Sequence, residues 1–185
     1  EVALRTATLM KDAGSPEAFI VLADDNGSDP VRTAMAGRVT AGEGWSNDQW
    51  AQVTGSINAF AGGVREQTGL RSVFHHHAAG FIETPDEIGK LMDGTDPDLV
   101  GLVLDMGHYM FGGGDPLPVL QAHGDRIWHV HFKDCHEEMA RRSREEAWDY
   151  FESVKQGVFC KLGEGGVDFP AIVAELKRQD YDGWI

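Results

Sequence analysis

Cysteine and long hydrophobic runs are scarce in this sequence of 185 residues. The two cysteines form no CxxC pair and are too few for a disulfide framework, so a reducing cytoplasm is the expected location. No uninterrupted apolar stretch approaches the roughly 20 residues that a membrane-spanning helix needs. These absences argue against a disulfide-rich secreted domain and a membrane-spanning protein, and they predict a soluble chain.

Basic residues are also scarce. There are 16 Lys and Arg against 30 Asp and Glu, which gives a formal charge of −14 with neutral histidine. Nucleic acids and anionic membranes bind basic surfaces, so neither is an expected partner. The remaining composition, 42% hydrophobic and 25% charged, is that of an ordinary globular protein, and the length suits one domain.

Short apolar runs alternate with helical segments along the chain, which is typical of βα units. The runs lack polar alternation, so they predict a parallel sheet that is covered on both faces. The predicted strands are 18–23, 71–77, 99–105 and 127–132, with a further short strand at 158–162. The predicted helices are 2–12, 46–67, 85–92, 115–122, 143–154 and 169–178, and 28–44 is predicted to be a loop.

This order of elements predicts part of a (β/α)₈ TIM barrel. A closed barrel needs about 250 residues. The chain opens within a predicted helix and stops within an apparent strand at 183–185, so we expect the sequence to omit residues at both ends. We therefore expect residues 1–185 to form one partial barrel domain.

Polar side chains gather where the apolar strands end. The triplet 75–77 is all histidine, Asp105 closes the next run with His108 three residues on, and Lys133-Asp134 follows the fourth run. In a parallel barrel the active site lies at the carboxyl ends of the strands. Histidine and aspartate among apolar neighbours are costly unless they are paired or bound to a metal, so the pattern predicts a shared metal site.

Strand alternation sharpens this prediction. Side chains two residues apart share a face, so His75 points with His77 and His129 points with His131. With Asp105 they offer mixed nitrogen and oxygen ligands, which suit Mn²⁺, Co²⁺, Zn²⁺ or Fe²⁺ better than Ca²⁺. Three alternatives stay open: the triplet forms an exposed turn, the second histidine pair is only hydrogen-bonded, or Asp105 only caps the following loop.

Other chemistries have weaker support. The glycine clusters at 112–114 and 163–166 lack the spacing of a phosphate-binding loop and are interpreted as turns. Cys135 follows the strand-end pair 133–134, so a reactive thiol there is an open alternative.

Four segments resemble the xylose-isomerase-like TIM-barrel superfamily of sugar isomerases, epimerases and dehydratases, and within it the inosose dehydratases. The resemblance covers about residues 70–185. The segments are FHHHAAGFIETPDEI, TDPDLVGLVLDMGHYMFGGGDP, DRIWHVHFKDC and GEGGVDFPAIVAELKRQDYDGWI.

The resemblance implies barrel strands 4 to 7 with the start of strand 8, and one divalent metal held by Glu, Asp, His and Glu at the ends of strands 5 to 8. Asp105 matches the strand 6 ligand and His131 the strand 7 ligand. No acid matches strand 5, where His75 stands as the ligand, with His77 or Glu83 as alternatives. The strand 8 Glu is expected after Ile185. The implied metal is Mn²⁺ or Co²⁺, with Zn²⁺, Mg²⁺ and Fe²⁺ also open.

The implied activity is dehydration of a cyclic keto-polyol through an enediolate, with the metal acting as a Lewis acid. Imidazoles suit acid–base and hydroxyl-binding work near neutral pH. Lys133 would hold an oxyanion, or would simply pair with Asp134. The expected catalytic residues are His77, His108, His129 and Lys133, and the expected substrate-binding residues are His76 and Asp134.

Three other functions are open. Sugar or sugar-phosphate isomerases and epimerases use the same barrel. Relatives often have Thr between the Asp and the Gly-His of this segment, so Met106 indicates a substrate preference that differs from theirs. An abasic-site endonuclease is opposed by the −14 charge. A barrel that binds sugar without turnover would explain the missing strand 5 acid. The expected partner is a small carbohydrate or polyol, and a homo-oligomer is as open as a monomer.

Overall fold

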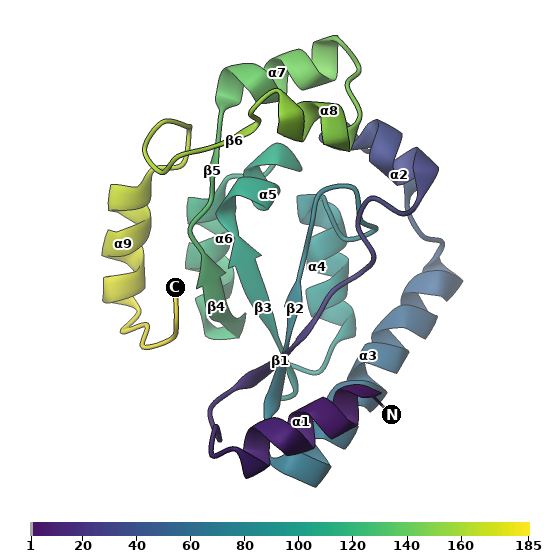
Figure 1. Ribbon diagram of the computed structural model, residues 1–185, viewed down its shortest axis with the longest axis vertical. Helices are drawn as coiled ribbons and strands as arrows, with labels where there is room; N and C mark the ends of the chain where they lie inside the picture. Colours follow the sequence, from purple (N-terminus) through teal and green to yellow (C-terminus); the bar gives the residue numbers. More distant parts are fainter. Residues whose placement is uncertain (1) are drawn as a thin grey trace.

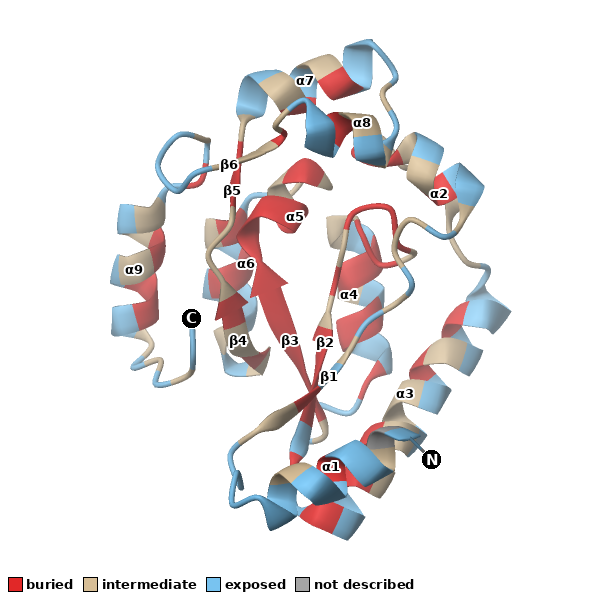
Figure 2. Cartoon of the chain, in the orientation of Figure 1, coloured by how far each residue is buried: buried red, intermediate tan, exposed pale blue. Residues whose placement is uncertain are grey.

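The computed structural model describes residues 2–185 and contains a four-stranded parallel sheet (Figure 1). The strands lie side by side in chain order, as the apolar runs predict. Strand β3 is buried along its whole length between β2 and β4, whereas β1 lies at one edge (Figure 2). The strands are β1 (Phe19–Leu22), β2 (Arg71–His75), β3 (Val100–Asp105) and β4 (Ile127–His131).

Most of the helices begin at residues whose side chains cap them. Ser46 and Thr84 each form a capping box, with Gln49 and Glu87 respectively, so the predicted starts of α3 and α4 are confirmed. The helices are α1 (Val2–Asp12), α2 (Pro30–Met35), α3 (Asn47–Thr68), α4 (Pro85–Gly94), α5 (Met106–Phe111), α6 (Pro116–His123), α7 (Glu137–Glu145), α8 (Tyr150–Lys155) and α9 (Phe169–Arg178). None of the helices described in residues 2–185 is long and apolar enough to cross a membrane.

The largest differences between the structure and the predicted elements are in two places. The segment 28–44 contains α2 and a 3₁₀ turn (Ala41–Glu43), because Asp29 accepts hydrogen bonds from the N–H groups of Val31 and Arg32 and starts a helix that has no apolar periodicity. The predicted helix 143–154 is two helices, because the backbone turns to φ 55° at Ala147 and Asp149 caps α8.

The two helices that replace the predicted helix 143–154 belong to one segment, residues 134–160, which is here called the arm. It contains α7 and α8 between two short strands, β5 (Asp134–Cys135) and β6 (Phe159–Cys160), which pair antiparallel. Strand β6 is shorter than the predicted 158–162. Figure 1 shows the arm lying across the carboxyl ends of β2 and β3, next to α2 and α5.

Two of the three apolar clusters in the described residues hold the sheet, its covering helices and the arm together. The main core packs the sheet against α3, α4, α6 and α9, with Leu102, Leu104, Ile88 and Ile172 almost fully buried. A smaller cluster joins the arm to the body of the fold. Its buried members are Ala36, Ala78, Ala79, Phe111, Cys135, Ala140 and Val158.

The segment after α9 returns to the sheet beside β4. The N–H of Val130 donates to the carbonyl of Trp184 (3.3 Å), and the Tyr181 hydroxyl donates to the same carbonyl (2.9 Å). Residues 183–185 are not a regular strand in the structure. Their assignment to the start of barrel strand 8, like that of β1–β4 to strands 4 to 7, stays a prediction.

Candidate metal centre

Three side chains from the ends of neighbouring strands converge on one point. His75 ends β2, Asp105 ends β3 and His131 ends β4. Each offers one ligand atom, and these atoms all lie within 4.8 Å of one another. Asp105 Oδ2 lies 3.5 Å from His75 Nε2 and 3.4 Å from His131 Nδ1. The parallel register explains the convergence, because it places Asp105 opposite His131 and brings the strand ends to one edge.

The polar atoms at this point fit a bound cation. The Asp105 side chain is fully buried, and its Oδ2 accepts no hydrogen bond, although nitrogens of His75, His131 and Lys133 lie 3.2 to 3.5 Å away. His75 Nε2 is likewise buried without a hydrogen-bond partner. Unpaired buried polar atoms are costly. A carboxylate and two imidazoles are donors that suit a divalent transition metal.

The Asp105 carboxylate is held in place by its surroundings. Its Oδ1 accepts a hydrogen bond from the N–H of His108 (3.0 Å) and caps α5. Burial alone would raise the pKa of Asp105, but the His131 and His75 imidazoles and the Lys133 ammonium hold that pKa well below its usual range. Asp105 therefore caps α5 with Oδ1, while Oδ2 faces His75 and His131.

His76 contacts the backbone of Asp105. It is fully buried, and its Nε2 accepts a hydrogen bond from the backbone N–H of Asp105 (3.3 Å). Burial lowers the pKa of His76 to about 3, which keeps the ring neutral and able to accept. The substrate-binding role expected for His76 stays a prediction, and in this structure its side chain has no exposed surface.

Three further histidines surround His75, Asp105 and His131. The ring of His77 lies 3.9 Å from that of His75 and 5.0 Å from that of His108, and the ring of His129 lies 5.1 Å from that of His131. His108 Nδ1 accepts the N–H of Ala78 (3.2 Å). Desolvation lowers the pKa of all three, to about 4 for His77. The structure therefore places these expected catalytic imidazoles around the centre.

The Lys133 side chain reaches the centre and contacts both Asp105 and Phe159 there. Its Nζ is 3.2 Å from Asp105 Oδ2 and 5.0 Å from the centre of the Phe159 ring. A Cβ at Gly107 would lie 2.5 Å from Lys133 Cγ, so the glycine in the segment DMGH leaves room for the lysine stem. Lys133 contacts Asp105 rather than Asp134, which corrects the alternative of a simple pair between neighbours. No sequence pattern points to Phe159.

Asp134 is turned away from the centre. Its fully buried carboxylate accepts four backbone N–H groups, from Cys135, Gly163, Gly165 and Val167, at 2.8 to 3.1 Å. A carboxylate has about four acceptor sites, so none is left for a substrate. The structure corrects the expectation that Asp134 binds substrate, and shows instead that it holds the glycine-rich segment 163–167.

Two alternatives from the sequence are also corrected. Glu83 does not join the group of His75, Asp105 and His131: its carboxylate accepts the N–H groups of Gly37 (2.7 Å) and Ala79 (2.6 Å), and burial raises its pKa to about 7. Cys135 is buried, and desolvation raises the pKa of its thiol to about 12, which makes it a poor nucleophile.

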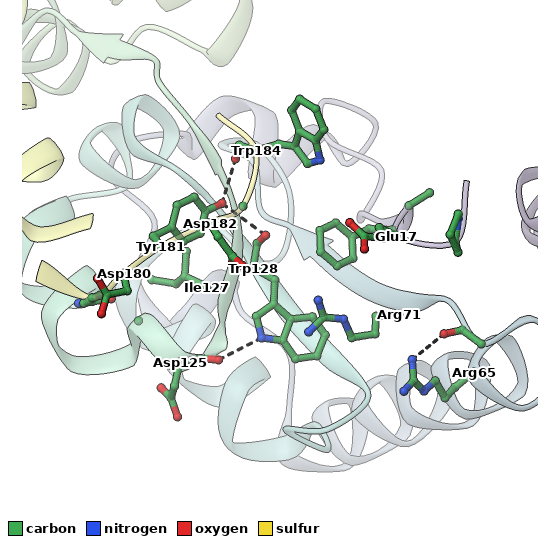
Figure 3. Close-up of a pocket in the computed structure, with 17 residues that line it drawn as sticks. Glu17, Arg65, Arg71, Asp125, Ile127, Trp128, Asp180, Tyr181, Asp182 and Trp184 are labelled. Atoms are coloured by element: carbon green, nitrogen blue, oxygen red, sulfur yellow. Dashed lines mark hydrogen bonds between the residues drawn. The ribbon is translucent and has the colours of Figure 1, made fainter. Parts of the chain in front are cut away.

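A cavity of about 540 Å³ lies at the opposite ends of the strands (Figure 3). There the Arg71 guanidinium stacks over Trp128 (4.5 Å) and Phe19 (5.2 Å). The amino ends of barrel strands ordinarily serve stability rather than catalysis. The histidines, Asp105 and Lys133 at the carboxyl ends do not line this cavity.

Comparison with known proteins agrees with this geometry. The family model described as "Xylose isomerase-like TIM barrel" matches residues 17–185. The chain belongs to this family. The predicted fold class is thereby confirmed, and the candidate centre lies at the converging ends of the parallel sheet.

Sequence relatives of this xylose isomerase-like chain include two inosose dehydratases. That of Bacillus velezensis is 39% identical over 141 residues, which cover 76% of this chain and 47% of the relative. That of Geobacillus kaustophilus is 37% identical over 140 residues, which cover 76% and 45%. The chain spans about half the length of the curated relatives it matches.

Solved structures share the fold at lower sequence identity. The IOLI protein with a bound zinc atom has a TM-score of 0.65 and 16% identity, covering 98% of this chain and 56% of that protein. The probable 3-DHS dehydratase AsbF from Bacillus anthracis has a TM-score of 0.63 and 18% identity, covering 99% and 73%. At these identities the likeness shows the xylose isomerase-like fold alone.

Proposed function

We propose that the protein is a divalent-metal-dependent dehydratase that acts on a cyclic keto-polyol of the inosose type. The observation that carries the proposal is the convergence of His75, Asp105 and His131, with buried Asp105 Oδ2 and His75 Nε2 lacking hydrogen-bond partners. Relatives 34–39% identical that are named inosose dehydratase support the reaction and the substrate class. The zinc atom in the IOLI protein supports metal binding in this fold.

His75, Asp105 and His131 would hold the metal, with further positions open to substrate. A divalent ion bound there supplies Lewis-acid stabilisation of negative charge on a substrate oxygen. Two imidazoles with one carboxylate suit Mn²⁺ or Co²⁺, which we expect first, and also Zn²⁺ and Fe²⁺, with Mg²⁺ the least suited.

The protein's own residues would move the protons. A neutral imidazole of His77, His108 or His129 takes the proton from the carbon next to the carbonyl group, which leaves an enediolate. The Lys133 ammonium holds the oxyanion that forms. The imidazolium then gives its proton to the β-hydroxyl, which leaves as water while the carbon–carbon double bond forms. One proton and one hydroxide leave the substrate, so the products are an enone and water.

An isomerase or epimerase is the second candidate. It needs the same deprotonation, and the L-ribulose 3-epimerase structure shares the fold with a TM-score of 0.63 at 18% identity. The two reactions differ in their second step, because an epimerase returns the proton and loses no hydroxyl group.

The test is a substrate panel of inososes and ketoses with the full-length protein, first stripped by a chelator and then reloaded with Mn²⁺, Co²⁺ or Zn²⁺. We expect an inosose to give a new enone-type absorbance only in the reloaded protein. Ketose turnover without that absorbance would replace the dehydratase by the isomerase or epimerase. Metal binding without turnover of any panel member would favour a non-catalytic barrel.

A further inference from the structure

Phe159 comes from the arm and lies against two expected catalytic side chains. Its ring centre is 4.7 Å from that of His108, at an interplanar angle of 65°. The Lys133 ammonium lies over the same ring, 5.0 Å from its centre. Phe111 packs on Phe159 from α5 at 6.0 Å. One aromatic ring thus contacts a cation and an imidazole that both adjoin Asp105.

Backbone contacts in the arm restrain the position of Phe159. In the β5–β6 pair Phe159 lies opposite Cys135, and the N–H of His136 donates to the carbonyl of Val158 (2.8 Å). Asp134, at the start of β5, accepts three backbone hydrogen bonds from the segment 163–167, which follows β6, and a fourth from the N–H of Cys135. Both strands of the pair are therefore fixed on each side of Phe159.

Lys133 needs such support, because its ammonium sits on a flexible four-carbon stem. The side chain is one-third exposed, so water competes for its donors. Gly107 leaves room for the stem, Asp105 attracts the charge from one side, and the Phe159 ring faces it from another. An aromatic face attracts a cation and offers it no hydrogen bond, which leaves the donors of the ammonium free for a substrate oxygen.

We propose that Phe159 is a positioning residue that holds the Lys133 ammonium at the centre through its aromatic face. The kinetic consequence rests on the proposed function, whereas the contact itself does not. An ammonium held in place before the reaction stabilises a developing oxyanion better than one that must first be ordered.

The contact is tested by nuclear magnetic resonance of the full-length chain with ¹³C-labelled lysine, the Lys133 signal being assigned with Lys133→Arg. An aromatic face shifts the signals of protons above it upfield. We expect an upfield-shifted Lys133 ε-CH₂ signal in the wild type and in Phe159→Tyr, and its return to the position of exposed lysines in Phe159→Leu. Phe111→Leu is the packing control and should keep the shift. An unshifted Lys133 signal in the wild type, or a shift that survives Phe159→Leu, would overturn the proposal.

The functional role is tested by kinetics on the metal-loaded protein with whichever panel substrate is turned over. Phe159→Leu should lower kcat about tenfold with KM and metal content little changed, and Phe159→Tyr should restore kcat. Adding Phe159→Leu to Lys133→Met should cost little more than Lys133→Met alone. Fully additive losses, or an equal loss in Phe111→Leu, would refute action through Lys133. Absence of turnover would refute the proposed function and leave the magnetic resonance test to decide the contact.

Discussion

The backbone N–H of His108 donates to one carboxylate oxygen of Asp105 (3.0 Å), while the other oxygen of Asp105 accepts no hydrogen bond and faces the centre. The first contact starts α5 and orients the carboxylate. The second oxygen is the one that lies 3.4 Å from His131 and 3.5 Å from His75. The structural and chemical roles of this residue can therefore be separated by substitution.

Asp105→Asn should keep the helix cap and lose the metal. Asparagine caps helices as well as aspartate does, so α5 should form, but the amide lacks the negative charge that a divalent ion needs. We expect metal affinity to fall by about 100-fold or more, with a melting temperature of the metal-free protein close to that of the wild type. Metal content after gel filtration and a thermal melt check this. Stoichiometric metal in the folded variant would remove Asp105 from the ligand set.

His75 and His77 should behave differently although they are near neighbours. His75→Ala removes an expected ligand and should abolish metal retention, as should His131→Ala. His77→Ala should retain metal and lose activity by about 100-fold, because only an acid–base group is removed. Metal content and turnover, measured in the same preparations, show which histidine binds the metal and which acts only in proton transfer. Metal loss in His77→Ala with retention in His75→Ala would exchange the two roles.

Glu83 should make the free energy of unfolding fall as the pH rises. Burial raises its folded-state pKa to about 7 from an ordinary value of 4.5. Between these values the folded state binds more protons than the unfolded state, so this contribution is complete below about pH 4.5 and lost by about pH 7. Its size is on the order of 3 kcal/mol.

Glu83→Gln isolates that contribution, because glutamine does not titrate. Urea unfolding from about pH 4.5 to about pH 8 in the presence of a chelator should show a smaller fall with pH in the variant than in the wild type. Histidines that are buried neutral act in the opposite direction, but they are common to both proteins and cancel in the difference. Identical pH dependence of the two proteins would show that Glu83 is ionised throughout.

Asp134→Asn should loosen the segment 163–167. The amide group replaces one acceptor oxygen with donors that face backbone N–H groups, and an unmade buried hydrogen bond costs about 1–3 kcal/mol. We expect faster hydrogen exchange at Gly163 and Gly165 and lower stability in urea. Asp168→Asn is the matched control in the same region, because Asp168 caps α9 and asparagine caps equally well. Equal effects of both substitutions would refute the anchoring role.

The strands and the three convergent residues could be predicted from the sequence for a simple reason. Continuous apolar runs fix β2, β3 and β4 to within two residues at either end, and parallel strands bring their carboxyl ends to one edge. Polar residues at those ends must then lie close together. The predicted strand 71–77 is too long, because the chain leaves the sheet after His75 and Glu83 binds the N–H of Ala79.

The direction of strand-end side chains and the approach of distant segments could not be predicted. Asp134 occupies the kind of position that predicts a substrate contact, but its orientation depends on N–H groups about thirty residues later in the chain, at Gly163 and Gly165. Phe159 reaches the centre only because the arm folds back through the β5–β6 pair. No local spacing or propensity encodes either contact.

The most direct test of the metal centre is anomalous diffraction from crystals of the full-length protein loaded with Mn²⁺, Co²⁺ or Zn²⁺. The geometry predicts one strong anomalous peak at about 2.0–2.2 Å from His75 Nε2, Asp105 Oδ2 and His131 Nδ1. A peak bound by other residues, or no peak at these strand ends in metal-loaded crystals, would contradict the assignment of the centre.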